Sequence, residues 1–183
     1  MFPQFHSYNS KKTDLIISVV LAILILITRI PFVSKYLYEW DSVNYALGFE
    51  KFDIVHHQPH PPGYIFYIGL GRVINTIFND PNTTMIFISI LFSILTVILI
   101  YFLVKQMFSR QMAIIASLLL VFNPLFWYYG EIATIYPSLA FFATLIVYLS
   151  YQVFKGNEKF FFTIWLCTNT SLIIMTHHLT CQF

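Results

Sequence analysis

Ionisable side chains are rare in this sequence, and several of them fall in one stretch, residues 36–64, which reads YLYEWDSVNYALGFEKFDIVHHQPHPPGY. Asp41 is spaced by four and eight residues from Tyr45 and Phe49, so a helix would place all three on one face. A carboxylate beside apolar rings has its pKa raised by desolvation, which suits a general base. The alternative is that Asp41 caps a helix over 42–52.

Three histidines, His56, His57 and His60, follow in the sequence HHQPHPPG. Imidazoles at this place could bind a phosphate or a metal ion. Their spacing matches only half of a zinc site, and no second pair of ligands is visible in the loop. We therefore predict that His57 and His60 bind substrate or phosphate and assign no metal ligand. Purely structural contacts are the alternative, and a divalent metal is left open as a cofactor.

Glu131 is the lone charged residue in the apolar stretch 111–154. An ionisable group in such a stretch is costly and typical of a functional site, so we predict that Glu131, like Asp41, is a catalytic residue. The alternative is that Glu131 is solvated in a short loop. In either case we expect its carboxylate at the outer mouth of a helical bundle, near Asp41, with Tyr136 and His60 in the same cavity.

Two arginines, Arg29 and Arg72, are candidate phosphate contacts. The planar guanidinium offers paired donors that match phosphate geometry. The alternative for both is that the side chain reaches toward lipid headgroups. We assign Arg72 to phosphate binding.

The elements that position these residues must be membrane helices. Hydrophobic residues make up 58% of the 183 residues and charged residues only 10%, and the mean hydropathy is +0.72. A soluble chain of this length could not bury that much apolar surface. A net charge of +2 without a basic cluster also excludes a nucleic-acid binder. We predict an integral protein of the cell membrane.

The expected fold class is all-α, a polytopic transmembrane bundle with interfacial helices in the first extracytoplasmic loop. A span needs about 20 apolar residues. The stretch 61–78 is short and contains Arg72. If this stretch lies on the outer surface and does not span the membrane, the Lys/Arg pairs of the other loops all lie on the cytoplasmic side. Expected spans are 14–34, 83–104, 111–129, 132–154 and 160–178, and the outer loop 35–82 should contain interfacial helices at 42–52 and 62–77.

Residues 1–183 are expected to form the N-terminal part of a single transmembrane domain, because no polar tail follows the last apolar run before Phe183. Cys167 and Cys181 would lie about 21 Å apart on one helix, which is too far for a disulfide.

Four segments carry a resemblance to a known family. They are WDSVNYAL at 40–47, HQPHPPGYIFY at 57–67, LVKQMFSRQMAIIASLLL at 103–120 and NPLFWYYGEIATIYP at 123–137. Together they resemble the polytopic GT-C glycosyltransferases, in the branch that contains the protein O-mannosyltransferases and the lipid A aminoarabinose transferase. HPPGY combined with an acidic first loop is more specific than either feature alone.

The resemblance implies an enzyme that transfers a sugar, with inversion, from a polyprenyl-phosphate carrier in the membrane to a protein, lipid or glycan acceptor outside the cytoplasm. It implies that Asp41 is the catalytic base or orients the acceptor, and that Glu131 lies near the same cavity. Many relatives have a second acidic residue directly after the first, whereas here Ser42 follows Asp41. The chain is also shorter than the family's usual number of spans would require, so this piece alone is expected to be inactive.

Two other functions are compatible with the composition. A transporter or channel subunit would distribute buried charges over several spans, whereas here most charges outside the expected cytoplasmic segments lie in one outer loop. An inactive envelope-assembly protein of the same fold is the third alternative, which the sequence leaves open.

Overall fold

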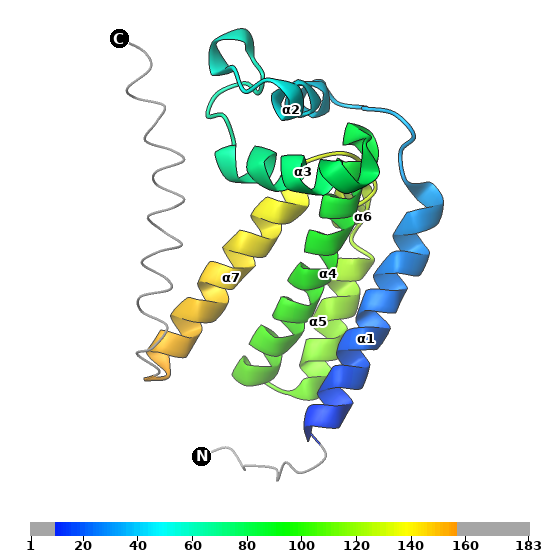
Figure 1. The fold of residues 1–183 in the computed structure, drawn as a ribbon. Coiled ribbons are helices and arrows are strands. Elements are labelled where there is room, and N and C mark those ends of the chain that lie inside the picture. Colours follow the sequence, from blue (N-terminus) through cyan, green and yellow to red (C-terminus); the bar gives the residue numbers. More distant parts are fainter. Residues whose placement is uncertain (1–9, 157–183) are drawn as a thin grey trace.

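The computed structural model describes residues 10–156, and this part of the chain is all-helical (Figure 1). Four helices form a bundle: α1 (Ser10–Arg29), α4 (Pro81–Met107), α5 (Arg110–Val121) and α7 (Tyr136–Phe154). Helix α4 packs against the other three. The predicted all-α fold class is confirmed.

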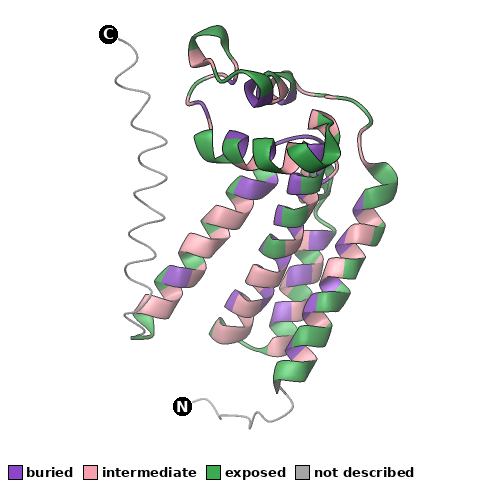
Figure 2. Cartoon of the chain, viewed as in Figure 1, coloured by how far each residue is buried: buried purple, intermediate pink, exposed green. Residues whose placement is uncertain are grey.

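Three segments in the described range are long and apolar enough to cross a membrane: Lys11–Phe32, Pro81–Met107 and Tyr136–Phe154. Helix α1 exposes large apolar side chains such as Leu15, Ile16 and Ile27 along its length (Figure 2). A helix in water rarely exposes apolar side chains along its whole length, whereas a helix in contact with lipid does. The chain is therefore an integral membrane protein.

The segment predicted as one span over 111–129 is two helices, α5 and the short α6 (Pro124–Tyr129). Proline has no backbone N–H to continue a helix, and the Asn123 side chain accepts a hydrogen bond from the Phe126 N–H at 3.0 Å, which starts a new one. With 12 residues, α5 is about 18 Å long, shorter than the ~30 Å hydrocarbon core.

The next predicted span, 132–154, begins later in the structure. Residues 131–135 are not helical, and α7 starts at Tyr136 with Pro137 in its first turn. The predictions 14–34 and 83–104 correspond to α1 with the 3₁₀ helix η1 (Ile30–Phe32) and to α4. The predicted span 160–178 lies outside the described residues.

The loop between α1 and α4 contains α2 (Trp40–Glu50), the 3₁₀ helix η2 (Ile54–His56) and α3 (Ile65–Phe78). Helices α2 and α3 lie across one end of the bundle (Figure 1). Helix α3 does not begin at Pro62, because Gly63 and Tyr64 have φ angles of 91° and 45°. This left-handed conformation cannot continue a right-handed helix.

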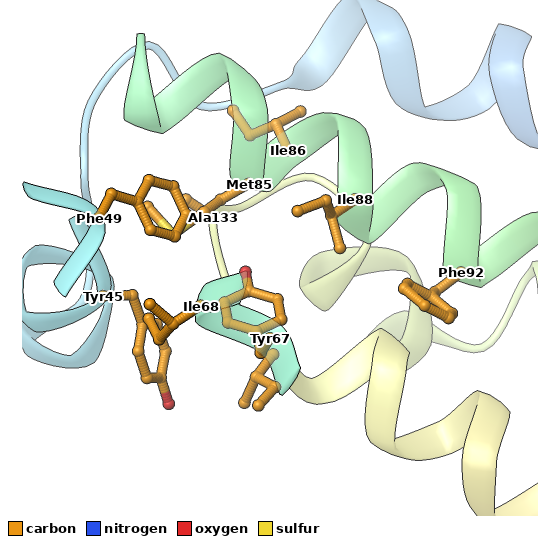
Figure 3. Packing of buried hydrophobic residues seen from close by; sticks show 10 residues of the cluster. Tyr45, Phe49, Tyr67, Ile68, Met85, Ile86, Ile88, Phe92 and Ala133 are labelled. Atoms are coloured by element: carbon orange, nitrogen blue, oxygen red, sulfur yellow. The ribbon is translucent and has the colours of Figure 1, made fainter. Parts of the chain in front are cut away.

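A hydrophobic cluster joins α2 and α3 to the bundle. Tyr45 and Phe49 of α2 pack with Tyr67 of α3, Met85 of α4 and Ala133 (Figure 3). Tyr45 and Phe49 are buried, as their predicted shared face with Asp41 requires. This cluster fixes α2, and with it the first turn that contains Asp41.

The opposite end of the bundle is held by polar contacts to Asp14 of α1. Its carboxylate accepts a hydrogen bond from the Tyr101 hydroxyl at 2.7 Å and forms ion pairs with Lys105 and Arg110. Helices α1, α4 and α5 are thereby joined where α1 begins. The basic residues of the α4–α5 turn thus lie at the end away from α2 and α3 (Figure 1).

Candidate active site

Asp41 and His60 face each other at the end of the bundle where α2 lies. Asp41 Oδ1 is 3.7 Å from His60 Nδ1, and the two side chains are 37% and 21% exposed. The His60 ring packs against the rings of Tyr45 and Tyr64, with centroids 5.7 and 5.2 Å away. The structure therefore brings together two of the residues that the sequence singled out, and the Asp41 carboxylate is reachable from outside.

The capping interpretation of Asp41 is wrong. Helix α2 has Glu39 at its N-cap position, and no side chain makes a capping hydrogen bond there. Asp41 lies inside the first turn instead. A carboxylate at that place is favoured by the positive end of the helix dipole, yet it keeps its oxygens for other partners.

Glu39 is a second carboxyl group beside Asp41, and our sequence analysis missed it. Burial raises the pKa of Glu39, and the negative charge of Asp41 raises it further. The signal was present as the sequence EWD, with two acids flanking Trp40 at the start of a helix. Glu39 and Asp41 therefore form two neighbouring carboxyl groups at the start of α2, which we call the acidic pair.

Tyrosines surround this acidic pair. Tyr45 and Tyr64 have ring centroids 5.3 Å apart, and burial raises the pKa of both hydroxyls. Tyr136, 42% exposed, interacts electrostatically with Glu39 and Asp41 from the start of α7. That Tyr136 shares a cavity with these residues stays a prediction. Protonated phenols offer hydrogen bonds to a polar substrate.

Glu131 lies at the same end of the bundle but interacts with Arg29 rather than with Asp41. Burial raises the pKa of Glu131, and the positive charge of Arg29 opposes that shift. Its Oε1 atom is buried and accepts no hydrogen bond from residues 10–156, while its main-chain carbonyl accepts one from the Ser34 N–H at 2.9 Å. The carboxyl group thus sits beneath the site.

The two arginines have different surroundings. Arg29 is fully buried, and its Nη2 donates to the Val121 carbonyl at 2.8 Å, so it is neither at the headgroups nor open to a phosphate. Arg72 is exposed and donates from Nη2 to the Gly48 carbonyl at 2.9 Å. Along α2, about 10 Å of helix rise separates Gly48 from Asp41.

His57 is exposed and has a left-handed φ of 56° after η2. The side-chain contacts that link its segment to α2 are made by His60, with Asp41 and Tyr45. Among residues 10–156 no group of three or more His, Cys, Asp or Glu side chains is arranged to hold a metal ion.

The non-helical residues 131–135 receive hydrogen bonds from three helices. The Ser42 hydroxyl of α2 donates to the Ala133 carbonyl. The Tyr67 hydroxyl of α3 donates to the Thr134 carbonyl at 3.2 Å, and Ser89 of α4 contacts the carbonyls at 132 and 134 at 3.0 Å each. Residues 132–135 are buried, and Glu131 is partly buried. This segment, which we call the 131–135 loop, adds hydrogen bonds to the hydrophobic cluster that joins α2 and α3 to the bundle. The sequence indicated a short loop at Glu131 as an alternative but did not indicate these hydrogen bonds.

Comparison with curated proteins gives no match, and neither does comparison with solved structures. Comparison with protein families gives a match over residues 59–177, more than half of the chain. The matched range contains His60, Arg72, Glu131 and Tyr136 and begins after Asp41. The membrane helices and this match agree: the chain belongs to the dolichyl-phosphate-mannose-protein mannosyltransferase family, a family of membrane glycosyltransferases.

Proposed function

We propose that this protein transfers a sugar from a polyprenyl-phosphate carrier to an acceptor hydroxyl at the extracytoplasmic surface of the membrane, with inversion at the anomeric carbon. The observation that carries the proposal is the pair of Asp41 and His60, 3.7 Å apart and partly exposed at the end of a membrane bundle. The family supplies the class of reaction. The GT-C branch suggested by the sequence is part of the proposal.

In this proposal Asp41 is the general base. It takes the proton of the acceptor hydroxyl while that oxygen bonds to the anomeric carbon of the sugar. The bond from the anomeric carbon to the phosphate oxygen breaks, and the polyprenyl phosphate leaves with both electrons. Attack from the face opposite the leaving group inverts the anomeric centre. A partly exposed carboxylate in the first turn of α2 is accessible to such an acceptor.

The other candidate residues are proposed to bind the two substrates. His60 would hydrogen-bond to a substrate oxygen beside Asp41. Arg72 and His57, both exposed on the loop, would contact the carrier phosphate. Tyr136 would bind a sugar hydroxyl. Glu131, at the start of the 131–135 loop, is proposed as a second, supporting acid that interacts electrostatically with Arg29.

The proposed side of the membrane follows from the basic residues. Lys105 and Arg110 lie at the end of the bundle opposite α2 and α3. Short loops with Lys and Arg stay in the cytoplasm. The acidic pair would then face outward, at the membrane surface where the phosphate of a lipid carrier lies.

The test is sugar transfer by membrane vesicles that contain the native protein, supplied with radiolabelled dolichyl phosphate mannose. Asp41→Asn keeps the shape of the side chain but cannot accept a proton, and a positioned base contributes about 10²–10⁴-fold. Loss of that order is expected. Glu50→Gln is the matched control, because Glu50 is an exposed acid at the other end of α2.

Transfer by Asp41→Asn at the wild-type rate would remove Asp41 as the base. Movement of the labelled lipid across the vesicle membrane without transfer to any acceptor would overturn the enzyme proposal and favour a transporter.

A further inference from the structure

We infer that Ser42 is a positioning residue: its hydroxyl fixes the first turn of α2 on the 131–135 loop and thereby orients the Asp41 carboxylate. The inference rests on the proposed role of Asp41. It assigns a function to a position where the resemblance to relatives leads one to expect an acid.

The hydrogen bond itself is the first argument. Ser42 is 1% exposed, and its hydroxyl donates to the carbonyl of Ala133, which is fully buried. A buried carbonyl outside a helix must find a donor from elsewhere. The two residues are 91 positions apart in the chain, so this bond joins the loop before α4 to the segment before α7.

The way α2 begins is the second argument. No side chain caps the first turn, although Ser, Thr, Asp and Asn commonly do so at such ends. The first turn is held from outside instead, by Ser42. Consecutive residues of a helix are rotated by about 100°. Fixing Ser42 toward the loop therefore fixes the rotation of Asp41, which emerges on the partly exposed side toward His60.

The distance between Asp41 and His60 is the third argument. At 3.7 Å the two atoms interact electrostatically but are too far apart for a hydrogen bond. No direct hydrogen bond from His60 therefore holds the carboxylate in place. Its orientation depends on the backbone of the first turn, and Ser42 is the residue of that turn that contacts the 131–135 loop through its side chain.

The experiment is a double-mutant cycle in membrane vesicles that contain the native protein, with radiolabelled dolichyl phosphate mannose as donor. Misplacement of a reacting group by about 1 Å costs up to about 10²-fold, so Ser42→Ala should lower kcat by about tenfold or more with little change in KM. Ser42→Thr, which keeps the hydroxyl, should restore most of the rate. In the Asp41→Asn background, Ser42→Ala should cause no further loss, because it acts through Asp41.

Ser117→Ala is the matched control. Ser117 is a fully buried serine of α5 whose hydroxyl has no hydrogen-bond partner in the described range. It should keep the wild-type rate. Equal losses for Ser42→Ala in both backgrounds would assign Ser42 a general structural role and overturn the inference. If Asp41→Asn is inactive while Ser42→Ala is unimpaired, the proposed function stands and the inference fails.

A second measurement needs no sugar donor. Asp41→Cys, with Cys167 and Cys181 replaced, is labelled with a water-soluble thiol reagent. Adding Ser42→Ala should change the labelling rate several-fold because the first turn is no longer fixed, and adding Ser117→Ala should leave it unchanged. Equal rates for all three proteins would overturn the inference even if Asp41 proves not to be the base.

Discussion

The guanidinium group of Arg29 donates a hydrogen bond to the carbonyl of Val121, at 2.8 Å and out of contact with solvent. Val121 is the last residue of α5, and the final carbonyls of a helix have no partner inside it. A cation there also balances the negative end of the helix dipole. Arg29 therefore allows α5 to end inside the protein, before α6 begins.

Replacing Arg29 by Met should destabilise the protein. The change keeps much of the side-chain volume but leaves the Val121 carbonyl without a donor, which costs about 1–3 kcal/mol for a buried group. Thermal unfolding in detergent would measure it. Arg72→Met is the comparison, because Arg72 also donates to a carbonyl but is exposed, so water can replace it. Equal losses for the two variants would contradict the capping role of Arg29.

Two glycines on α3 should respond in opposite ways to alanine. A Cβ added at Gly71 would lie 2.2 Å from Cζ of the buried Phe49 ring, so α2 and α3 would have to move apart. A Cβ at Gly69 meets nothing within 4 Å. Gly71→Ala should therefore lower both the melting temperature and sugar transfer.

Gly69→Ala should raise stability by about 0.5–1 kcal/mol through helix propensity, and it controls for any effect of alanine on α3. If Gly71→Ala is as stable as Gly69→Ala, the close packing of α2 on α3 is not as described.

Glu131→Gln should reduce the loss of stability on raising the pH. Because burial raises the folded-state pKa of Glu131 above its ordinary 4.5, the folded protein holds this proton more tightly than the unfolded chain. The resulting stability is present below 4.5 and is lost as the pH rises through the folded pKa. Chemical unfolding in detergent at several pH values would measure the difference. Parallel curves for the two proteins would contradict it.

Glu131→Gln also separates the two acids in function. Glu131 interacts with Arg29 beneath the site, whereas Asp41 is accessible. Sugar transfer should therefore fall much less for Glu131→Gln than for Asp41→Asn. An equal loss in both variants, at equal protein levels, would make Glu131 a second essential group.

Asp53 should keep the turn that follows α2 intact in mild acid. Hydrogen bonds from Lys51 and His56 lower its pKa to about 2. For a lowered pKa, the stabilising contribution is present above the ordinary value of 3.8 and is lost as the pH falls toward 2. Cleavage within residues 51–58 by an acid protease should accelerate over that interval. Asp53→Asn should be cleaved quickly throughout, and a wild-type rate for this variant would contradict the prediction.

The parts of the structure that follow local rules were predictable from sequence. Apolar length located α1 and α4, and the spacing of Asp41, Tyr45 and Phe49 predicted a helix that α2 confirms. That the two aromatic residues are buried is a finding of the structure. The break at Asn123–Pro124 also follows a local rule. The hydropathy stays high across these residues, so apolar length alone did not locate the break. The hydrogen bond from the Phe126 N–H to the Asn123 side chain sets the helix boundary.

The contacts that complete the site are not local. Ser42 and Arg29 each donate a hydrogen bond to a main-chain carbonyl more than ninety residues away. Because every residue has a main-chain carbonyl, the sequence does not reveal which one is the acceptor. Glu39 was missed for a related reason, because its importance comes from burial next to Asp41 rather than from a motif. Sequence therefore indicated candidate residues for the chemistry, whereas the contacts that hold them became visible only in the structure.

The 131–135 loop has a consequence for biosynthesis. A ribosome makes Asp41 and the whole of α2, α3 and α4 before it makes Ala133, whose carbonyl the Ser42 hydroxyl needs. The segment that contains the acidic pair is thus synthesised early. The Ser42 hydroxyl has no hydrogen-bond acceptor at Ala133 until the residues just before α7 have been made. Helix α4, which is made earlier, can already cover α2 and α3, so the 131–135 loop adds the last of the described contacts that hold the turn with Asp41.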